Sequence, residues 1–349
     1  MTERVAGVRL APYTTLGLGG PARAFAEAGS AEEIVELVAA ADAAGEPVLV
    51  LGGGSNLVVA DEGFDGLVVR VASKGVRTEA HDGRVRVTAQ AGEDWDALVA
   101  LAVAEGWSGV ECLSGIPGLV GSTPIQNVGA YGQDVSQTIT GVRVHDRRTG
   151  EVRDLEAAEC GFAYRDSAFK GEPGRHVVLA VTYELAADDL SGPVAYKELA
   201  GRLGVELGER VPLGVAREGV LALRAGKGMV LDPDDPDTHS AGSFFTNPVL
   251  MAEQAAQLDL RVPGFPRWDT PDGSVKVPAA WLIENAGFPK GYRRGPARIS
   301  TKHTLAMTNP ELTATTEELL DLAREVRDGV WEKFGVTLVN EPVMVGTAL

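Results

Sequence analysis

A long stretch with little regular patterning, Ile116–Gly132, is the most informative part of the sequence for chemistry. It alternates small and amide residues with apolar residues such as Leu119 and Val128, which favour burial. A long loop inside a domain is usually functional or disordered, and its apolar anchors argue against disorder. Backbone N–H groups between such anchors would suit a pyrophosphate and the polar edge of a flat ring. The stretch, called the cradle below, therefore predicts a rigid binding loop.

A second candidate phosphate site is the glycine-rich loop Gly52–Asn56. Glycine permits positive φ and close backbone approach, so that N–H groups can converge on a phosphate. The loop lies between two short apolar stretches, Val48–Leu51 and Leu57–Val59, that we expect to be strands. Such a loop between strands is more often only a turn, so both interpretations stay open.

The stretch Gly17–Ala22 matches the G-x-G-x-x-A pattern of a dinucleotide site, but its surroundings do not. A Rossmann site needs a buried strand before the loop and a helix directly after it. The preceding Ala11–Thr15 is a poor strand, and the residues around Phe25 do not begin an amphipathic helix. Any dinucleotide must therefore be held in another way.

Three polar residues outside these loops could take part in chemistry. Arg165 belongs either to a surface turn with one salt bridge or to a site where Asp166 fixes it to face a carboxylate. Ser243 follows Gly242 without the G-x-S-x-G pattern of a hydrolase, and a lone serine is most often a cap or loop residue. Glu341 follows a predicted strand, where a glutamate is usually solvated.

The elements expected to position these residues indicate an α+β protein with a boundary near residue 210. A chain of 349 residues is long enough for two or three domains. A capping box at Ser30–Glu33 opens a helix that should end at Gly45. The other expected helices are Asp94–Glu105, Pro193–Leu203, Pro212–Ala225, Ala279–Asn285 and Thr316–Phe334. Further expected strands are Leu67–Val71, Arg84–Ala89, Val142–His145, Glu151–Leu155, Val177–Leu185, Val336–Val339 and Val343–Val345.

Composition narrows the possible partners. The net charge of −17 disfavours nucleic acid and anionic membranes, and an anionic substrate would need local positive charge. The mean hydropathy is +0.00 and no apolar stretch approaches the ~18 residues of a membrane span, so we expect no membrane span. The N-terminus carries an early acid, Glu3, and no long apolar stretch, so we expect no signal peptide and a cytoplasmic protein. Cys112 and Cys160 lack metal-ligand spacing, so we expect no metal and two reduced thiols.

Together these stretches resemble the MurB family, the flavin-dependent UDP-N-acetylenolpyruvoylglucosamine reductases of bacterial cell-wall synthesis. The matching stretches follow the family's order and approximate spacing over nearly the whole chain, and the cradle and Gly242–Pro248 are the most specific. They are Thr15–Gly17, Gly52–Asn56, Ile116–Gly132, Tyr164–Ser167, Gly242–Pro248 and Glu341–Pro342.

The resemblance implies an FAD-binding module of the vanillyl-alcohol-oxidase (PCMH) type in two subdomains, followed by an α+β substrate domain. On this basis we expect the subdomains at 1–72 and 73–210 and the substrate domain at 211–334. Whether 335–349 joins the first subdomain is left open. FAD would be noncovalent, because the residues expected to hold it include no His or Cys. Those residues are Gly53, Gly54, Ser55, Asn56, Leu57, Gly121, Ser122, Ile125, Gln126, Asn127, Gly129 and Ala130.

The resemblance also implies the reaction. NADPH would be the co-substrate, and UDP-N-acetylglucosamine enolpyruvate would be reduced to UDP-N-acetylmuramate by a monomer. Arg165 and Glu341 would polarise the substrate carboxylate, and Ser243 would act as general acid. The residues expected to bind substrate are Tyr131, Arg165, Tyr196, Lys227 and Asn247. Tyr196 matches the tyrosine of a substrate-covering loop found in the longer subclass of the family.

The chain also departs from the family pattern. Val343-Met344-Val345 follows Glu341-Pro342 where relatives often carry an acid and a base, and Thr246, Trp268 and His303 replace the usual Lys, Tyr and Gln. One alternative is a related oxidase with covalent flavin, which the lack of His and Cys in the FAD loops disfavours. The other is an inactive nucleotide-sugar binding protein, which the joint presence of Arg165, Ser243 and Glu341 disfavours.

Overall fold

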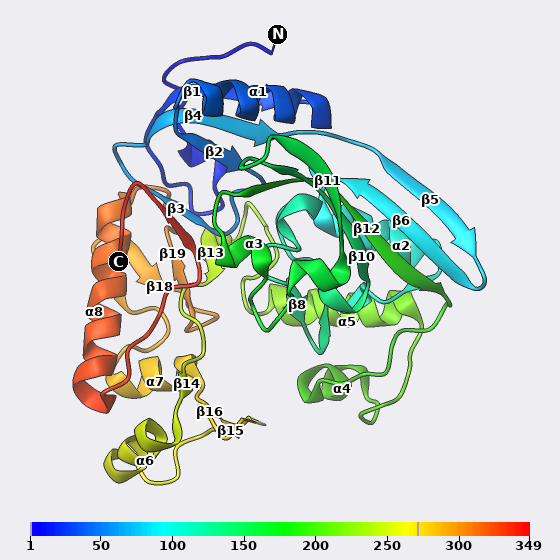
Figure 1. Cartoon of the computed structure of the whole chain (residues 1–349). Helices are drawn as coiled ribbons and strands as arrows, with labels where there is room; N and C mark the ends of the chain where they lie inside the picture. Colours follow the sequence, from blue (N-terminus) through cyan, green and yellow to red (C-terminus); the bar gives the residue numbers. More distant parts are fainter. Residues whose placement is uncertain (1, 271) are drawn as a thin grey trace. The chain divides into compact units, whose positions relative to one another are not determined.

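The computed structural model describes residues 2–270 and 272–349 (Figure 1). By its contacts the chain forms two compact units whose segments alternate along the sequence, and each unit is described by itself. The first comprises Met1–Val8, Ala22–Gly53 and Asp65–Val230, and the second comprises Arg9–Pro21, Gly54–Phe64 and Leu231–Leu349. The three-domain division expected from the sequence stays a prediction.

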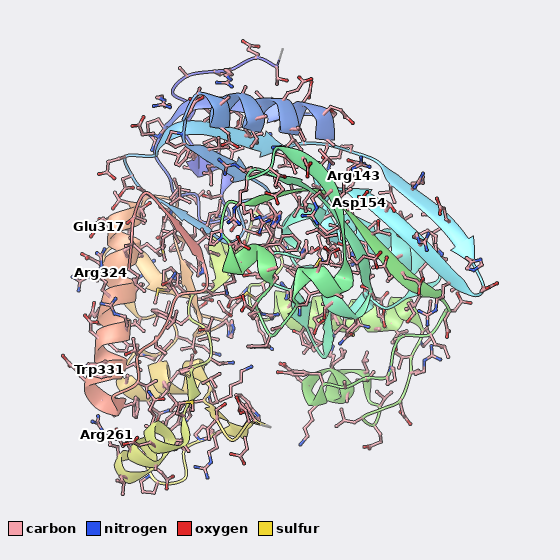
Figure 2. All side chains as sticks on the ribbon, in the orientation of Figure 1. Arg143, Asp154, Arg261, Glu317, Arg324 and Trp331 are labelled. Carbon is pink, nitrogen blue, oxygen red and sulfur yellow. The ribbon has the colours of Figure 1, made fainter. Side chains whose placement is uncertain are left out.

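The first unit is built on two sheets. The smaller has the order β1-β4-β2, from Ala22–Ala28, Phe64–Val71 and Val48–Leu51, and β2 runs parallel to β4. The larger is antiparallel, with the order β11-β10-β12-β6-β5, and β7 also pairs with β12. Its strands are β5 (Val76–His81), β6 (Arg84–Gln90), β7 (Trp107–Ser108), β10 (Ile139–Asp146), β11 (Glu151–Glu156) and β12 (His176–Ala187). Figure 2 labels one cross-strand pair of the β10–β11 hairpin, Arg143 opposite Asp154.

The helices of the first unit begin and end largely where local chemistry predicted. The Ser30 hydroxyl caps α1 (Ala31–Ala43) by accepting from the Glu33 N–H at 3.2 Å, and Gly45 follows the helix end at φ +65°. The Asp94 side chain caps α2 (Trp95–Ala104) in the same way. The remaining helices are α3 (Ala168–Gly171), α4 (Lys197–Leu203) and α5 (Leu213–Ala225).

The second unit carries one long helix against small sheets. The β strands are β13 (Ser240–Ser243), β19 (Ala306–Thr308), β18 (Ala297–Ile299) and β17 (Arg293–Arg294) in one sheet, β14 (Val249–Leu250), β16 (Val275–Lys276) and β15 (Trp268–Asp269) in another, and β3 (Leu57–Val59) paired in parallel with β20 (Val343–Val345). The helices are α6 (Ala252–Arg261), α7 (Ala279–Ala286) and α8 (Thr316–Phe334). Helix α8 buries leucines and valines in the core and presents Glu317, Arg324 and Trp331 along its outer face (Figure 2).

Two expected elements need correction, and strand β5 of the larger sheet was not expected. Val336–Val339 is not a strand, because it runs beside the irregular Phe244–Thr246 and makes isolated backbone hydrogen bonds instead of a ladder. Helix α4 begins at Lys197 and not at Pro193, because Val194 exchanges backbone hydrogen bonds with the Gly208–Glu209 turn. The strand β5 was missed, since all of its residues are exposed and it lacks an apolar face.

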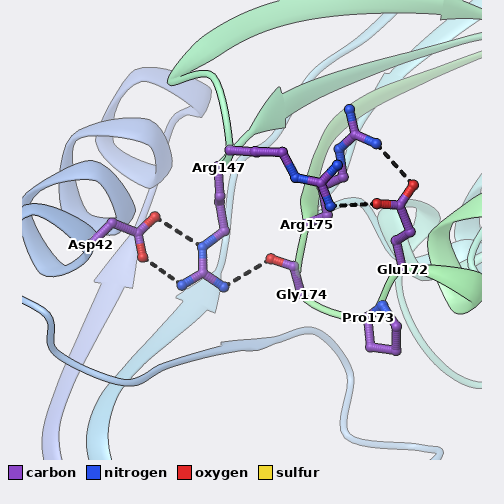
Figure 3. Close-up of a pocket in the computed structure, with 7 residues that line it drawn as sticks. Asp42, Arg147, Glu172, Pro173, Gly174 and Arg175 are labelled. Carbon is purple, nitrogen blue, oxygen red and sulfur yellow. Dashed lines mark hydrogen bonds and ion pairs between the residues drawn. The ribbon is translucent and has the colours of Figure 1, made fainter.

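Ion pairs join α1 to the turn between β10 and β11, around an open cavity of about 500 Å³ (Figure 3). The Arg147 guanidinium donates to both carboxylate oxygens of Asp42, and Arg148 and Arg175 share Glu172. At the end of β10, the fully buried Asp146 accepts two N–H bonds from Arg175, at 2.8 and 3.2 Å. These bonds hold the pKa of Asp146 well below its usual range, since they favour its charged form.

Replacing this carboxylate should destabilise the protein at neutral pH and not in strong acid. Asp146→Asn is expected to lower the free energy of unfolding by about 1.5–3 kcal/mol, the range for hydrogen bonds to charged groups. Because the folded pKa is depressed, the contribution is fully present above the unfolded pKa of about 3.9 and is lost progressively as pH falls from there through the folded pKa, so the gap between variant and wild type should narrow near pH 3. Urea unfolding at pH 7 and near pH 3 measures the difference, and a gap between variant and wild type that widens in acid would contradict this assignment.

Candidate functional site

The residues expected to act in catalysis and binding are divided between the two units. The first unit holds Gly53, the cradle residues, Arg165, Tyr196 and Lys227, and the second holds Gly54, Ser55, Asn56, Leu57, Ser243, Asn247 and Glu341. The cavity in Figure 3 is lined by none of them, and each guanidinium in it is already paired with a carboxylate. That cavity therefore belongs to the framework of the first unit.

The two loops expected to hold FAD lie against each other in the first unit. A Cβ added to Gly53 would lie 2.7 Å from the Cα of Gly118, and one added to Gly52 would lie 2.7 Å from the Ser122 hydroxyl. At Gly121 an added Cβ would meet the Ala91 side chain at 2.6 Å. At Gly53 the loop backbone lies directly against the cradle backbone, and at Gly52 and Gly121 an added Cβ would collide with a side chain, so a larger residue would force a shift at each position. Such a surface of main-chain groups suits the diphosphate of a dinucleotide, so these residues fit FAD.

The cradle and the residues just before it are held to the core of the first unit by two buried aromatic side chains. The Trp95 indole donates to the Leu113 carbonyl at 3.1 Å, and the Tyr183 hydroxyl bonds the Thr123 hydroxyl at 2.8 Å. The two rings lie 5.7 Å apart. Burial raises the pKa of Tyr183, so its hydroxyl keeps its proton at neutral pH. The irregular cradle thus takes its position from α2 and β12.

Arg165 sits on a tight turn that the cradle holds. Backbone bonds in both directions between Ala163 and Asp166 close the turn, and Arg165 takes φ +53° at its third position. Its guanidinium donates to the carbonyl oxygens of Asn127 and Gly129, at 3.3 and 2.5 Å. A non-glycine residue with positive φ is strained, and such strain often marks functional positions. Fixing of Arg165 by Asp166 stays a prediction.

Asn127 connects the Arg165 turn to the cradle. Its side chain is 4% exposed, donates to the Ala163 carbonyl at 3.0 Å and accepts from the Ser136 N–H at 3.1 Å. Its own φ is +45°, a left-handed conformation that asparagine adopts more readily than most residues do. The side-chain amide of Asn127 therefore has a structural task, and the binding of FAD by this residue stays a prediction.

Three of the residues expected to bind substrate cluster in the first unit. The rings of Tyr131 and Tyr196 meet edge to face at 5.6 Å, and the Lys227 ammonium lies 5.7 Å from the Tyr131 ring centre. Lys227 also pairs with Glu198 at 2.6 Å, a partner that the sequence did not indicate. Burial raises the pKa of Tyr131, against an opposing effect of the Lys227 charge.

In the second unit, backbone hydrogen bonds bring Ser243 and Glu341 to neighbouring segments. Ser243 ends β13 opposite Ala306. The Glu341 N–H donates to the Phe244 carbonyl at 2.9 Å, one residue beyond Ser243. Two residues further along, the Val343 N–H donates to the Asn56 carbonyl at 2.9 Å. Part of the glycine-rich loop, the serine and the glutamate are therefore joined through main-chain bonds.

Three further positions in the second unit have clear local roles. The Asn247 side chain accepts from the Ala279 N–H at 2.9 Å and so caps α7. Val343 and Val345, which stand where the family pattern led us to expect an acid and a base, pair with Leu57 and Val59 as part of β20. The substitution places strand-forming side chains where a polar pair was expected.

Other kinds of site find no support in the described part of the chain. Within residues 2–270 and 272–349, no group of three His, Cys, Asp or Glu side chains is arranged to hold a metal ion. Nor does any helix of these residues have the length and apolar character to cross a membrane. Burial raises the pKa of the Cys112 thiol to about 12 and that of Cys160 to about 11, so both free thiols are poorly reactive.

Comparison with known proteins agrees with this arrangement. Residues 22–156 match the FAD binding domain model, and residues 234–345 match the model of the UDP-N-acetylenolpyruvoylglucosamine reductase C-terminal domain. The chain is 58% identical over 356 residues to the UDP-N-acetylenolpyruvoylglucosamine reductase of Thermobifida fusca, covering 100% of this chain and 99% of that one. It is also 58% identical to the reductase of Streptomyces coelicolor, covering 97% of this chain and 90% of the relative.

A solved structure supports the same relationship. The crystal structure of UDP-N-acetylenolpyruvylglucosamine reductase (MurB) from Thermus caldophilus covers 99% of both chains, with a TM-score of 0.65 and 28% identity. The expected fold class, an α+β chain with an FAD-binding module followed by a C-terminal domain, is confirmed. The protein is accordingly a flavin-dependent oxidoreductase. On these similarities over its full length, the chain belongs to the MurB family of UDP-N-acetylenolpyruvoylglucosamine reductases.

Proposed function

We propose that this protein reduces UDP-N-acetylglucosamine enolpyruvate to UDP-N-acetylmuramate for peptidoglycan synthesis. NADPH is the reductant, FAD is noncovalent, and the enzyme works as a cytoplasmic monomer. The observation that carries the proposal is the hydrogen bond from the Glu341 N–H to the Phe244 carbonyl. It holds a candidate general acid, Ser243, beside a candidate carboxylate-binding residue, as this reduction requires.

The proposed chemistry divides between the cofactor and the side chains. FAD, when bound by the abutting glycine loops, supplies the transfer of hydride from NADPH to the terminal carbon of the enol ether. Negative charge then develops on the adjoining carbon and on the carboxylate of the substrate. Ser243 donates a proton to that carbon. Because a serine hydroxyl is a weak acid, stabilisation of the developing charge must lower the barrier, by about 2.7–4 kcal/mol for each well-aimed donor.

Arg165 and Glu341 are proposed to stabilise that charge at the substrate carboxylate. The bonds of Arg165 to the Asn127 and Gly129 carbonyls support this, since they tie a cation to the cradle. Glu341 can help only if it is protonated or bridged by a donor, because adjacent carboxylates repel each other. A guanidinium suits the planar carboxylate through two parallel hydrogen bonds.

The UDP moiety is proposed to meet the tyrosine cluster and Lys227. The ammonium beside Tyr131 supplies the local positive charge that an anionic substrate needs in a chain of net charge −17. Glu198 holds this cation at 2.6 Å, so the substrate diphosphate must compete with that carboxylate. Asn247 is proposed to donate to the nucleotide diphosphate from its amide. Assignment to the longer subclass rests on Tyr196.

Gly54→Ala should reduce FAD binding far more than an ordinary glycine substitution does. An added Cβ would lie 1.9 Å from the Tyr13 carbonyl, and the residue has φ +61°, so the glycine-rich loop must move. Gly83→Ala is the matched control, since Gly83 has φ +73° and nothing within 4 Å of an added Cβ. We expect the control to keep about one FAD per chain and to lose roughly 1–2 kcal/mol of stability.

Flavin absorbance after acid precipitation of wild type and both variants checks this assignment. Release of FAD into the supernatant shows noncovalent binding, and FAD that stays with the precipitate shows covalent attachment. Equal FAD content in Gly54→Ala and Gly83→Ala would remove the glycine-rich loop from the cofactor site.

Ser243→Ala should separate the two half-reactions. Reduction of FAD by NADPH needs no proton from Ser243, so its rate should stay near that of wild type. Reoxidation by the enol ether should slow by roughly 10²–10⁴-fold, the range for positioned general acids. Stopped-flow flavin absorbance measures both steps. If both slow equally, Ser243 only shapes the site, and if neither slows, the proton comes from another group and Glu341 becomes the candidate.

A further inference from the structure

Glu111 is a buried carboxylate without a role in the proposed reaction. It lies in the 3₁₀ turn Glu111–Leu113 and is 0% exposed. Its Oε2 accepts from the Gly109 N–H at 2.7 Å. Its Oε1 accepts from the Gly192 N–H at 2.7 Å and from the Gln133 side-chain amide at 2.9 Å. Since an unpaired N–H at such a site costs free energy, the carboxylate clamps these three donors together.

The clamp joins two stretches that are far apart in the sequence. Gln133 belongs to β9 (Gln133–Asp134), which pairs with β8 (Gly129–Ala130) at the end of the cradle. Gly192 begins the stretch Gly192–Glu198, which leads into α4 and carries Tyr196. A single buried side chain thus ties the cradle hairpin to the stretch that follows β12.

Further contacts join the same two stretches, the end of the cradle and Gly192–Glu198. A Cβ added to Gly132 would lie 2.9 Å from the Ala195 Cβ, so the two backbones pass closely there. The Tyr131 and Tyr196 rings meet next, at 5.6 Å. Tyr196 is 48% exposed, so contacts with other parts of the protein restrain it little. Its place beside Tyr131 therefore depends on how the preceding backbone is held.

We infer that Glu111 is a positioning residue for the substrate, because its bond to the Gly192 N–H, together with the Val194 bonds to the Gly208–Glu209 turn, fixes the stretch that places Tyr196 beside Tyr131. The inference rests on the proposed binding of a UDP-sugar by Tyr196. Only a few residues separate the two ends of this connection: the Glu111 carboxylate bonds Gly192, and the chain runs from there through Ala195 to the Tyr196 ring. The carboxylate of Glu111 bonds Gly109, Gln133 and Gly192, none of which is proposed to act in catalysis or to bind FAD.

An exchange of side chains can remove the Gly192 bond selectively. In Glu111→Gln alone, the amide oxygen can remain where Oε1 was, so the bonds from Gly192 and Gln133 persist and only Gly109 loses its acceptor. In the double variant Glu111→Gln with Gln133→Glu, the amide at position 111 must donate to the carboxylate at position 133. Its N–H₂ then faces Gly192, which loses its acceptor, while Gly109 keeps a carbonyl oxygen.

The double variant should raise the KM for the UDP-sugar enol ether by roughly 5- to 30-fold, the effect of one or two lost interactions of this kind. The rate of flavin reduction by NADPH and the kcat should change little, as for lost uniform binding. Hydrogen exchange of the backbone amides in Gly192–Glu198 should become faster. Glu111→Gln alone should change KM less. Glu36→Gln, an exposed charge change on α1, should change nothing.

A double-mutant cycle with Tyr196→Ala distinguishes positioning from general destabilisation. If Glu111 acts through Tyr196, adding Tyr196→Ala to the exchange variant should raise KM no further than Tyr196→Ala does alone. Additive effects, or a wild-type KM together with faster hydrogen exchange, would overturn the inference. If the exchange variant fails to bind FAD, Gly132→Ala provides a second test. Its added Cβ would push the backbone at Gly132 away from that at Ala195, so KM should rise while kcat stays unchanged. If the wild-type enzyme does not reduce the UDP-sugar, the proposed function is wrong. If hydrogen exchange of the amides in Gly192–Glu198 is the same in the double variant as in wild type, the clamp by Glu111 is wrong.

Discussion

The stretch from Leu113 to Thr123 has almost no regular structure, and buried backbone groups must still find hydrogen-bond partners. Trp95 and Tyr183 hold it from two sides, one from α2 and one from β12. Both side chains are 1% exposed, so water does not compete for these bonds. The abutting glycine loops, the Arg165 turn and the Glu111 clamp all attach to this stretch or to its continuation, so their geometry depends on these two attachments.

In the second unit, main-chain hydrogen bonds and not side chains position the segments of the candidate site. The bond from Glu341 to the Phe244 carbonyl, and the pairing of β20 with β3, place the Ser243 and Glu341 segments without a specific side chain. This explains how the chain accommodates valine at positions 343 and 345. The ladder with Leu57 and Val59 uses backbone groups that any residue except proline supplies. Side chains can therefore vary there while the position of Glu341 is kept.

Local patterns predicted those elements whose determinants lie within a few residues. Helix α8 has the expected bounds because its apolar spacing and its Thr315–Glu318 capping box are local features. β5 was missed and Val336–Val339 was wrongly expected to be a strand, because strand formation depends on a neighbour from elsewhere in the chain. For the same reason, the motif residues of the candidate site could be located while partners such as Glu198 and Gln133 could not.

The sequence by itself determined the family, the α+β class, the glycine-rich loops and the identity of the candidate catalytic residues, because these depend on residue type and order. Only the tertiary structure decided that Asn127 supports the Arg165 turn, that Asn247 caps α7 and that Glu111 ties Gly192 to the cradle. Each of these tasks depends on a hydrogen bond between residues distant in the sequence. Whether a polar side chain binds a ligand or supports the fold is set by which donors and acceptors folding brings within about 3 Å of it.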